Sequence, residues 1–291
     1  MTAVASAQAT RVRPSPRGQR WLLKSAAYLA MVAISAFMLF PFLWMLVSSI
    51  KPFAEIFAGD SFLPRAPTLD NYVRLFEQGG ALIKIWNSFF IATVYTVAAV
   101  LLCALGGYAF AKFPFPGRRA LFALMLATIT IPFAVVMIPL FIMMRNVFDW
   151  IDTPWPLIVP TAANAFGIFF MRQYLLALPD EMLDAARVDG ASELQIFTKV
   201  VLPTSIPGLV SLSIIFFMAR WNDFLWPLAV LRSDEMRTVP LMLIALQGPP
   251  GRTAYDLLMA GSVVSVLPML VLFLLLQRHL VAGVTTGAVK G

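Results

Sequence analysis

One short polar group interrupts a long apolar stretch of this chain, Arg220-Trp221-Asn222-Asp223. Arg220 and Asp223 are three residues apart, so on a helix they share a face and can form an ion pair. Trp can stack on the face of a sugar ring, and Asn both donates and accepts hydrogen bonds. Two interpretations stand at this point. Either Trp221, Asn222 and Asp223 line a path for a polar ligand, or Arg220 and Asp223 form a structural ion pair.

A second distinctive stretch is the mixed-charge segment 172–203. Pro179, followed by the acidic residues 180–181, suits the start of a helix, where the helix dipole favours negative charge. Gly190 suits the position just after a helix end, where positive φ is needed. Ser192 and Gln195 have the spacing of a capping box for a second helix. We therefore predict a helix, a sharp turn at Gly190 and a second helix.

The second of these helices is predicted to be amphipathic. Leu194, Phe197 and Val201 have the spacing of one helix face, and Pro203 forbids simple continuation of the helix. The pair of helices could rest on the bilayer surface or form a compact knob that fits a groove in another protein. The narrow apolar face, and a first helix too acidic for anionic lipid, favour the protein groove.

Other reactive residue types are scarce. Cys103 is the only cysteine and His279 the only histidine, so neither a disulfide framework nor a His-rich metal site is possible. No Gly-rich loop ending in Gly-Lys-Ser/Thr is present, so we do not expect ATP to bind this chain. We find no nucleophile–base arrangement and no metal-ligand spacing. We therefore expect a chain that is not an enzyme and binds no cofactor or metal.

The composition predicts a membrane protein. Hydrophobic residues make up 60% of the 291 residues and charged residues only 13%, whereas soluble domains have about 45–50% and about 25%. Lipid can face apolar residues that a soluble protein could not cover. The net charge of +7 comes from basic residues placed between apolar runs, which argues against nucleic acid as a partner.

Six apolar segments are long enough to cross a bilayer, which takes roughly 20 residues. They are Ala26–Ser48, Ile85–Ala111, Ala120–Met144, Thr153–Met171, Val200–Ala219 continued by Phe224–Leu231, and Leu257–Gln277. We predict an all-α, polytopic bundle of six transmembrane helices. At about 1.5 Å per residue from Pro203, Asp223 would lie roughly 30 Å along the fifth helix, near the outer leaflet.

The distribution of charge predicts the orientation. With the N-terminus in the cytoplasm, the cytoplasmic segments are strongly basic and the outside segments nearly neutral, as the positive-inside rule requires. Six crossings return the C-terminus to the same side. We expect a disordered tail over 1–20, a membrane domain over 21–282 and a second cytoplasmic tail over 283–291. The outside loop 51–84 is expected to contain a short helix near Thr68–Phe76.

The spacing within segment 180–203 resembles the coupling-loop signature of ABC-importer permeases, Glu-Ala-Ala-x3-Gly-x9-Ile-x-Leu-Pro. Two substitutions, Asp for Glu and Val for Ile, leave the spacing intact. The matching residues are Asp184, Ala185, Ala186, Gly190, Val200, Leu202 and Pro203.

Three further stretches narrow the resemblance to the carbohydrate-uptake permeases of the maltose-permease type. They are Pro67–Tyr72 in the first outside loop, Trp221–Phe224 in the fifth apolar segment, and the tail Val281–Gly291. In that family the tail reaches into the interface between the ATPase subunits. The small residues of this tail suit an extended strand in a protein crevice. By resemblance, Gly283, Thr286, Gly287 and Lys290 would contact the ATPase.

The resemblance implies the fold of a type I ABC-importer permease and a role in uptake. The expected substrate is a mono-, di- or oligosaccharide, or a sugar or glycerol phosphate. The expected partners are a second, similar permease, two ATP-binding cassette ATPase subunits that hold ATP and Mg, and an extracytoplasmic sugar-binding protein. The expected location is the bacterial inner membrane, with both ends in the cytoplasm.

Two other classes of function remain as alternatives. A stand-alone secondary carrier would need buried carboxylates or related inverted halves, and the sequence shows neither. A membrane enzyme would need a polar catalytic cluster at one bilayer face, for which Asp223 and His279 are the few candidates.

Overall fold

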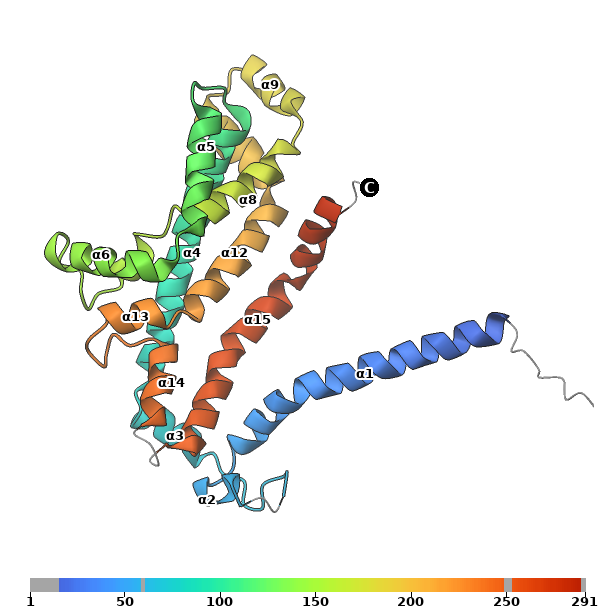
Figure 1. Ribbon diagram of the computed structural model, residues 1–291, viewed down its shortest axis with the longest axis vertical. Coiled ribbons are helices and arrows are strands. Elements are labelled where there is room, and N and C mark those ends of the chain that lie inside the picture. Colours follow the sequence, from blue (N-terminus) through green and yellow to red (C-terminus); the bar gives the residue numbers. More distant parts are fainter. Residues whose placement is uncertain (1–15, 59–60, 249–252, 289–291) are drawn as a thin grey trace, which may run out of the picture.

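The computed structural model describes residues 16–58, 61–248 and 253–288, without the side chains of 16–20, 22 and 277–288. Every regular element in these ranges is helical (Figure 1). The elements are α1 (Pro16–Ser48), α2 (Phe53–Ile56), α3 (Asp70–Glu77), α4 (Ala81–Lys112), α5 (Arg118–Ala127), η1 (Thr128–Thr130), α6 (Phe133–Asn146), α7 (Trp155–Ile158), α8 (Ala165–Leu176), α9 (Asp180–Val188), α10 (Glu193–Ile196), η2 (Phe197–Val201), α11 (Leu202–Thr204), α12 (Ile206–Trp221), α13 (Leu225–Val230), α14 (Val239–Gln247) and α15 (Tyr255–Ala288).

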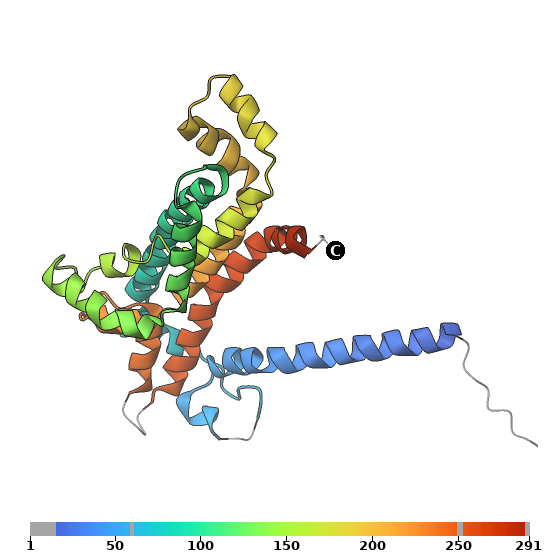
Figure 2. The same cartoon turned by 45° about the horizontal axis from the view of Figure 1, so that its top comes forward.

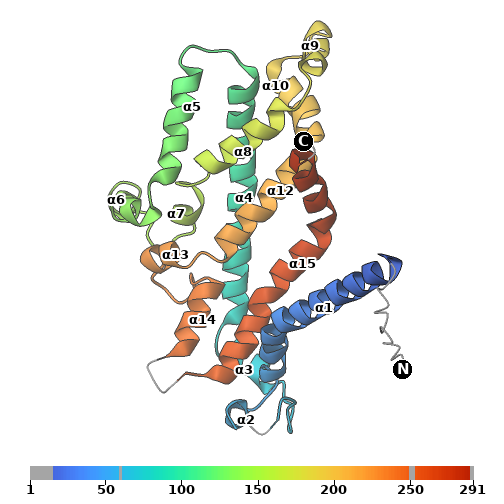
Figure 3. The same ribbon diagram turned by 45° about the vertical axis from the view of Figure 1, so that its right-hand side comes forward.

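Helix α4 is the central element of the bundle (Figure 3). It has 32 residues, about 48 Å at 1.5 Å per residue, and it packs most extensively on α8 and α12. Small residues permit this close packing. A Cβ added at Gly107 would lie 2.7 Å from Cβ of Met171 and 2.8 Å from the backbone nitrogen of Arg172. The main apolar core therefore follows α4 along its length.

The structure confirms an all-helical fold with helices long and apolar enough to span a membrane. Within the described residues, three helices are long and apolar enough to cross a bilayer: Leu23–Ser48, Ala81–Lys112 and Tyr255–Leu276. Two pairs of bent helices raise this number to five. The remaining apolar helix, α8, has only 12 residues. The expected six crossings are consistent with this arrangement, but only three of them are single long helices.

The third apolar segment, expected as one membrane crossing, is broken into two helices. Helix α5 and η1 end before Ile131, whose ψ is 116°, and α6 begins after Pro132 at a bend of 97°. A proline excludes the helical conformation at the residue before it, which explains the position of the break.

The fourth and fifth segments also depart from simple crossings. The fourth has the short α7, then non-helical residues 159–164, then α8. The fifth is bent by 79° between Glu193–Thr204 and Ile206–Trp221. Pro203 does not end the helix as expected, because a π-helical turn, η2, precedes it and α11 carries the chain on to Thr204. The bend falls instead at Ser205, two residues later.

Helix α1 projects sideways from the other helices, near the end of the molecule where α2 and α3 lie (Figure 2). Its apolar stretch Leu23–Ser48 is almost wholly exposed in this chain. The helix begins at Pro16, within the region 1–20 expected to be a tail, and residues 1–15 lie outside the described part. Helix α3 confirms the short helix expected near Thr68–Phe76. Below, "α9 end" and "α3 end" denote the two opposite ends of the molecule (Figure 1).

Candidate functional site

The structure confirms the helix–turn–helix predicted for segment 180–203. Helix α9 ends at Val188, and Gly190 has a φ of +81°, the left-handed conformation that favours glycine. The amide of Gly190 donates to the carbonyl of Arg187, and the amide of Ala191 donates to that of Ala186, both at 3.0 Å. These bonds satisfy carbonyls that the end of a helix leaves free.

Helix α10 starts with the predicted capping box. The Ser192 hydroxyl accepts from the Gln195 amide at 3.4 Å, and the Gln195 side chain accepts from the Ser192 amide at 2.8 Å. Only two residues separate the turn at Gly190 from this new helix, so α9 and α10 form one compact unit, which we call the knob.

The apolar face of the second helix differs from the prediction. Ile196, Phe197 and Val201 are buried, but Leu194 is 70% exposed. Residues two apart on a helix point about 200° away from each other, so the burial of Ile196 turns Leu194 outward. Val188 at the end of α9 is also exposed, at 87%. The knob therefore presents two large apolar side chains that no part of the described chain covers.

The residues of the coupling signature divide into two groups. Asp184, Ala185 and Gly190 are exposed on the knob, and Pro203 is exposed in α11. The other three signature residues are partly buried and pack against the main core: Ala186, Val200 and Leu202. The signature thus combines an outward surface with the contacts that anchor it.

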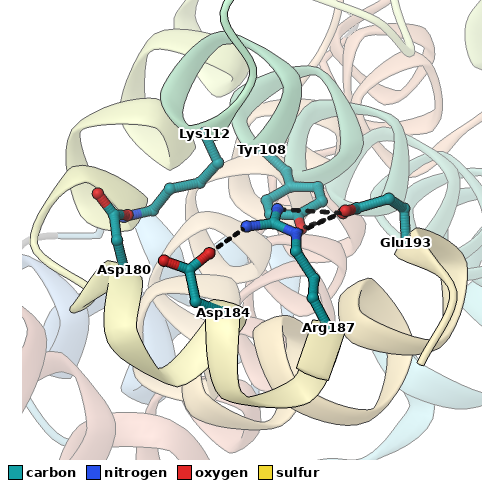
Figure 4. A network of polar contacts seen from close by, with 6 residues as sticks. All are labelled: Tyr108, Lys112, Asp180, Asp184, Arg187 and Glu193. Carbon is teal, nitrogen blue, oxygen red and sulfur yellow. Dashed lines mark hydrogen bonds and ion pairs between the residues drawn. The ribbon is translucent and has the colours of Figure 1, made fainter. Parts of the chain in front are cut away.

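Two contacts join the knob to the end of α4 (Figure 4). The Lys112 ammonium, with only 6% of its side chain exposed, donates to the carbonyl of Leu178 and to the carboxylate of Asp180, both at 2.6 Å. The Tyr108 hydroxyl donates to Glu193 at 3.0 Å. Asp180 begins α9 and Glu193 begins α10, so each helix of the knob has its own bond to α4.

Arg187 completes the network by joining the two helices of the knob (Figure 4). Its guanidinium donates to Asp184 at 2.7 Å and to Glu193 at 2.8 Å. These hydrogen bonds lower the pKa of the Glu193 carboxyl and raise the pKa of Arg187. The hydrogen bond from Lys112 likewise lowers the pKa of Asp180. The carboxylates of Asp180 and Glu193 are thus ionised well below neutral pH.

Sequence reasoning did not identify Tyr108 and Lys112. They are four residues apart at the end of an apolar run, so they share a helix face that points toward the following loop. Two polar side chains with this spacing, at the end of a membrane helix, are the signal that could have found them.

The second candidate site is a cleft of about 220 Å³ near the middle of the bundle. Arg220 donates to Asp223 at 2.6 Å and to the Thr161 hydroxyl at 2.7 Å, and its guanidinium lies 4.2 Å from the centre of the Tyr95 ring. The predicted ion pair between Arg220 and Asp223 is thus confirmed. The sequence did not indicate Tyr95 or Thr161, although each is a polar residue within an apolar stretch.

The cleft lies beside the middle of α4. Arg220 stacks on Tyr95, which is 14 residues from one end of α4 and 17 from the other, so the cleft is near the middle of this helix. The 79° bend falls between Thr204 and Ile206, so it removes only about 3 Å from the roughly 30 Å counted from Pro203 to Asp223. The position of Asp223 near the outer leaflet stays a prediction.

Of the three candidate path residues, Asp223 alone lines this cleft. Trp221 is 1% exposed, and its indole donates to the carbonyl of Ser265 at 3.1 Å, so it packs toward α15. Asn222 is exposed and donates to the carbonyl of Met218 at 2.9 Å. The structure therefore separates these three neighbours in sequence.

The chain was compared with known families and proteins. Residues 103–286 match the family described as "Binding-protein-dependent transport system inner membrane component". The arabinooligosaccharide transport system permease of Halalkalibacterium halodurans is 40% identical over 93% of this chain and 96% of its own length. The chain belongs to this family of permeases. The expectation of a transport subunit rather than an enzyme is thereby confirmed.

Other relatives are named for the transport of other sugars. The trehalose transport permease of Mycobacterium tuberculosis is 34% identical and the lactose transport permease of Rhizobium radiobacter 35%, over 89% and 90% of this permease and 94% of each relative. A solved chain from a bacterial importer of the acidic polysaccharide alginate superposes with a TM-score of 0.80 at 24% identity. It covers 92% of this permease and 99% of that chain, and it confirms the fold of an ABC-importer permease.

The tail of this permease differs from the expected extended strand. The backbone of α15 is helical as far as Ala288, so Gly283, Thr286 and Gly287 are all in a helix. Lys290 lies outside the described residues. In a helix the backbone N–H and C=O groups bond to one another, whereas an extended strand needs a partner for them. A single chain without its partners therefore favours the helix.

The described residues contain no group of three or more His, Cys, Asp or Glu side chains that could hold a metal ion. Cys103 is buried in the core beside α8 and has no second cysteine to pair with. Within each of the two sites, the polar side chains are instead hydrogen-bonded among themselves.

Proposed function

We propose that this permease forms half of the transmembrane path for a sugar in an ATP-driven importer. A second, similar permease would form the other half, and an extracytoplasmic binding protein would deliver the sugar. Two ATPase subunits would bind ATP and Mg on the opposite side of the membrane. The sugars named for its relatives, arabinooligosaccharides, trehalose and lactose, support an uncharged sugar as substrate.

The knob carries this proposal, as the site where one of the two ATPase subunits would dock. Its surface has the exposed small residues Ala185 and Gly190 and two exposed apolar side chains, Val188 and Leu194. Low relief with protruding apolar groups fits a groove on a soluble protein, because burial of each apolar side chain there would be favourable by roughly 1–3 kcal/mol. Lipid is a poor alternative, because Asp180, Asp184 and Glu193 are acidic.

Movement of the knob would reach the bundle through α4. On α4, Lys112 binds α9 and Tyr108 binds α10. Helix α4 also packs on α8, which precedes the knob in the chain, and on α12, which follows it. When ATP binding closes the two ATPase subunits, the knob would move as a rigid body and tilt these three helices together. ATP hydrolysis would return these helices to their starting positions.

The α9 end is proposed to face the cytoplasm, with both termini on that side. The positive-inside rule supports this, since Lys112, Arg118 and Arg119 all lie on the short hairpin beside the knob. The tail residues Gly283, Thr286, Gly287 and Lys290 are proposed to contact the ATPase. Deletion of 283–291 should then lower ATP-dependent uptake while the complex still assembles, and normal uptake would contradict the tail contact.

The docking proposal is tested by replacing Leu194→Asp and measuring how much ATPase co-purifies with the permease. A charge on the buried side of an interface should reduce co-purification at least tenfold. The matched control is Leu69→Asp at the α3 end, because Leu69 is 68% exposed and Leu194 is 70% exposed. Equal recovery of the ATPase with both variants would contradict the proposal. Sugar uptake by the purified permease without any ATPase would indicate a secondary carrier instead.

A further inference from the structure

The cleft beside Tyr95 lies where the helices of the bundle are interrupted. Helix α12 ends at Trp221 and α13 begins at Leu225, α6 begins at Phe133 after its bend, and residues 159–164 are not helical. Broken helices at membrane depth are tolerated where the backbone is buried in protein or lines a cavity. In transporters such breaks frequently form the binding site for the solute.

Arg220 supplies hydrogen-bond donors to this cleft. Its side chain is 9% exposed, and two of its nitrogens donate to Asp223 and Thr161. Its Nε is buried and has no hydrogen-bond partner among the described residues. A buried donor without a partner costs free energy, so a ligand oxygen that accepts a hydrogen bond from Nε would bind more tightly.

Asp223 and Thr161 retain hydrogen-bonding capacity toward the same cleft. The Asp223 side chain is 22% exposed, and a carboxylate can accept about four hydrogen bonds, of which Arg220 and the backbone amides of Phe224 and Trp226 supply three. The Thr161 hydroxyl accepts from Arg220 and can still donate its own hydrogen. Together these groups offer both donors and acceptors, which is what vicinal hydroxyl groups require.

Aromatic side chains form the opposite wall. Phe133 is 39% exposed and meets the buried Trp226 edge to face at 5.9 Å. Trp226 is fixed by a hydrogen bond from its indole to the carbonyl of Pro156 at 2.9 Å. The exposed ring of Phe133 could cover the apolar face of a sugar ring. The volume of about 220 Å³ is below the range of roughly 300–1,000 Å³ for drug-sized ligands, so it suits one small unit.

The charges of the cleft select against anions. The guanidinium of Arg220 is already paired with Asp223, so the cleft has no net charge from these two residues. A carboxylate or phosphate placed there would lie close to the Asp223 carboxylate, and like charges repel strongly away from water. Hydroxyl groups can bond to both residues without this repulsion.

We infer that this cleft is a subsite for one uncharged sugar unit, and that Asp223 makes this permease favour neutral over anionic sugars. The inference rests on the proposed transport function and narrows its substrate class, because sugar phosphates and uronic acids are excluded. Tyr95 would act as a positioning residue, since the guanidinium of Arg220 stacks on its ring.

The test uses the intact transport complex in detergent, without its binding protein, and measures sugar binding by saturation-transfer NMR. The probes are arabinotriose, trehalose and lactose as neutral sugars and trigalacturonate as the anion. At least one neutral sugar should bind, and trigalacturonate at least tenfold more weakly. Thr161→Val should weaken the neutral sugar about tenfold, and Thr161→Ser should restore it, because one hydrogen bond near a charge is lost and regained.

Asp223→Asn should reduce the preference for neutral sugar at least tenfold. Its matched control is Asp234→Asn, which breaks the ion pair to Lys84 near the α3 end and should leave binding unchanged. Equal binding of both sugar classes by the wild type, or no effect of Thr161→Val, would overturn the inference. Absence of binding by every sugar would overturn it as well. These outcomes leave ATPase docking intact, whereas failure of the proposed function would show as loss of ATP-dependent uptake of all sugars.

Discussion

The ammonium of Lys112, at the last residue of α4, lies 2.6 Å from the carboxylate of Asp180, at the first residue of α9, although 68 residues separate them in sequence. Lys112 also donates to the carbonyl of Leu178, so it holds the entry to the knob at two points. The central helix of the bundle is thus fastened directly to the segment proposed to receive the ATPase.

Replacement of Lys112 by Met should uncouple sugar uptake from ATP hydrolysis. Met keeps most of the side-chain volume but leaves the Leu178 carbonyl without this donor, so stability should fall by about 1–3 kcal/mol, whereas sugar uptake per ATP hydrolysed should fall severalfold. The matched control is Lys84→Met, because Lys84 is also 6% exposed and bonded to an exposed aspartate, Asp234. The ratio of uptake to hydrolysis in proteoliposomes checks this. An equal ratio in both variants would contradict a role of Lys112 in coupling.

Substitution of Gly190 should act through the backbone and not through a clash. No atom lies within 4 Å of a Cβ added there, but the φ of +81° is unfavourable for other residues by about 1–2 kcal/mol. Gly190→Ala and Gly190→Leu should therefore lower the stability of the permease alone by a similar amount, and Gly190→Asn by less. Uptake should fall most with Leu, because its bulk lies on the docking surface. Equal uptake by Ala and Leu variants would show that this surface is free.

The packing of the knob should weaken in acid. Arg187 holds the pKa of Glu193 below its ordinary value of 4.5, so this ion pair contributes stability above that pH, and the contribution is lost as the pH falls through the lowered pKa. Amide hydrogen exchange in α9 and α10, corrected for its intrinsic pH dependence, should therefore lose protection below about pH 4.5. Glu193→Gln should reduce this pH dependence, and the part that remains should come from Asp180, whose pKa is lowered by Lys112. A wild-type profile with the same shape as that of the variant would exclude Glu193 as the cause.

Two adjacent glycines in α4 offer a matched pair for the packing of the core. Gly107→Ala places a Cβ 2.7 Å from Cβ of Met171 and 2.8 Å from the backbone of α8, so it should cost about 1–3 kcal/mol. Gly106→Ala meets only side-chain atoms of Ile168, the nearest at 3.2 Å, and no backbone, so it should cost less. Thermal unfolding in detergent compares them. A larger loss of stability with Gly106→Ala would contradict this account of the contact between α4 and α8.

Local patterns predicted the knob well. A turn at Gly190 and a capping box at Ser192 depend on residues within one or two helical turns, so the sequence around them determines them. The same patterns failed for Leu194 and Pro203, since the buried face of the second helix and the π-helical turn before Pro203 depend on contacts with the rest of the bundle.

The sequence by itself determined that this chain is an all-helical membrane permease, because apolar length and a spaced signature survive any arrangement of the helices. Only the tertiary structure decided which residues meet. It brought Tyr95 and Thr161 to Arg220 and turned Trp221 toward α15, because the direction of a side chain depends on where α12 bends and which helix it meets there. It also joined Lys112 to Asp180, since a contact between residues far apart in sequence follows from packing and leaves no local pattern.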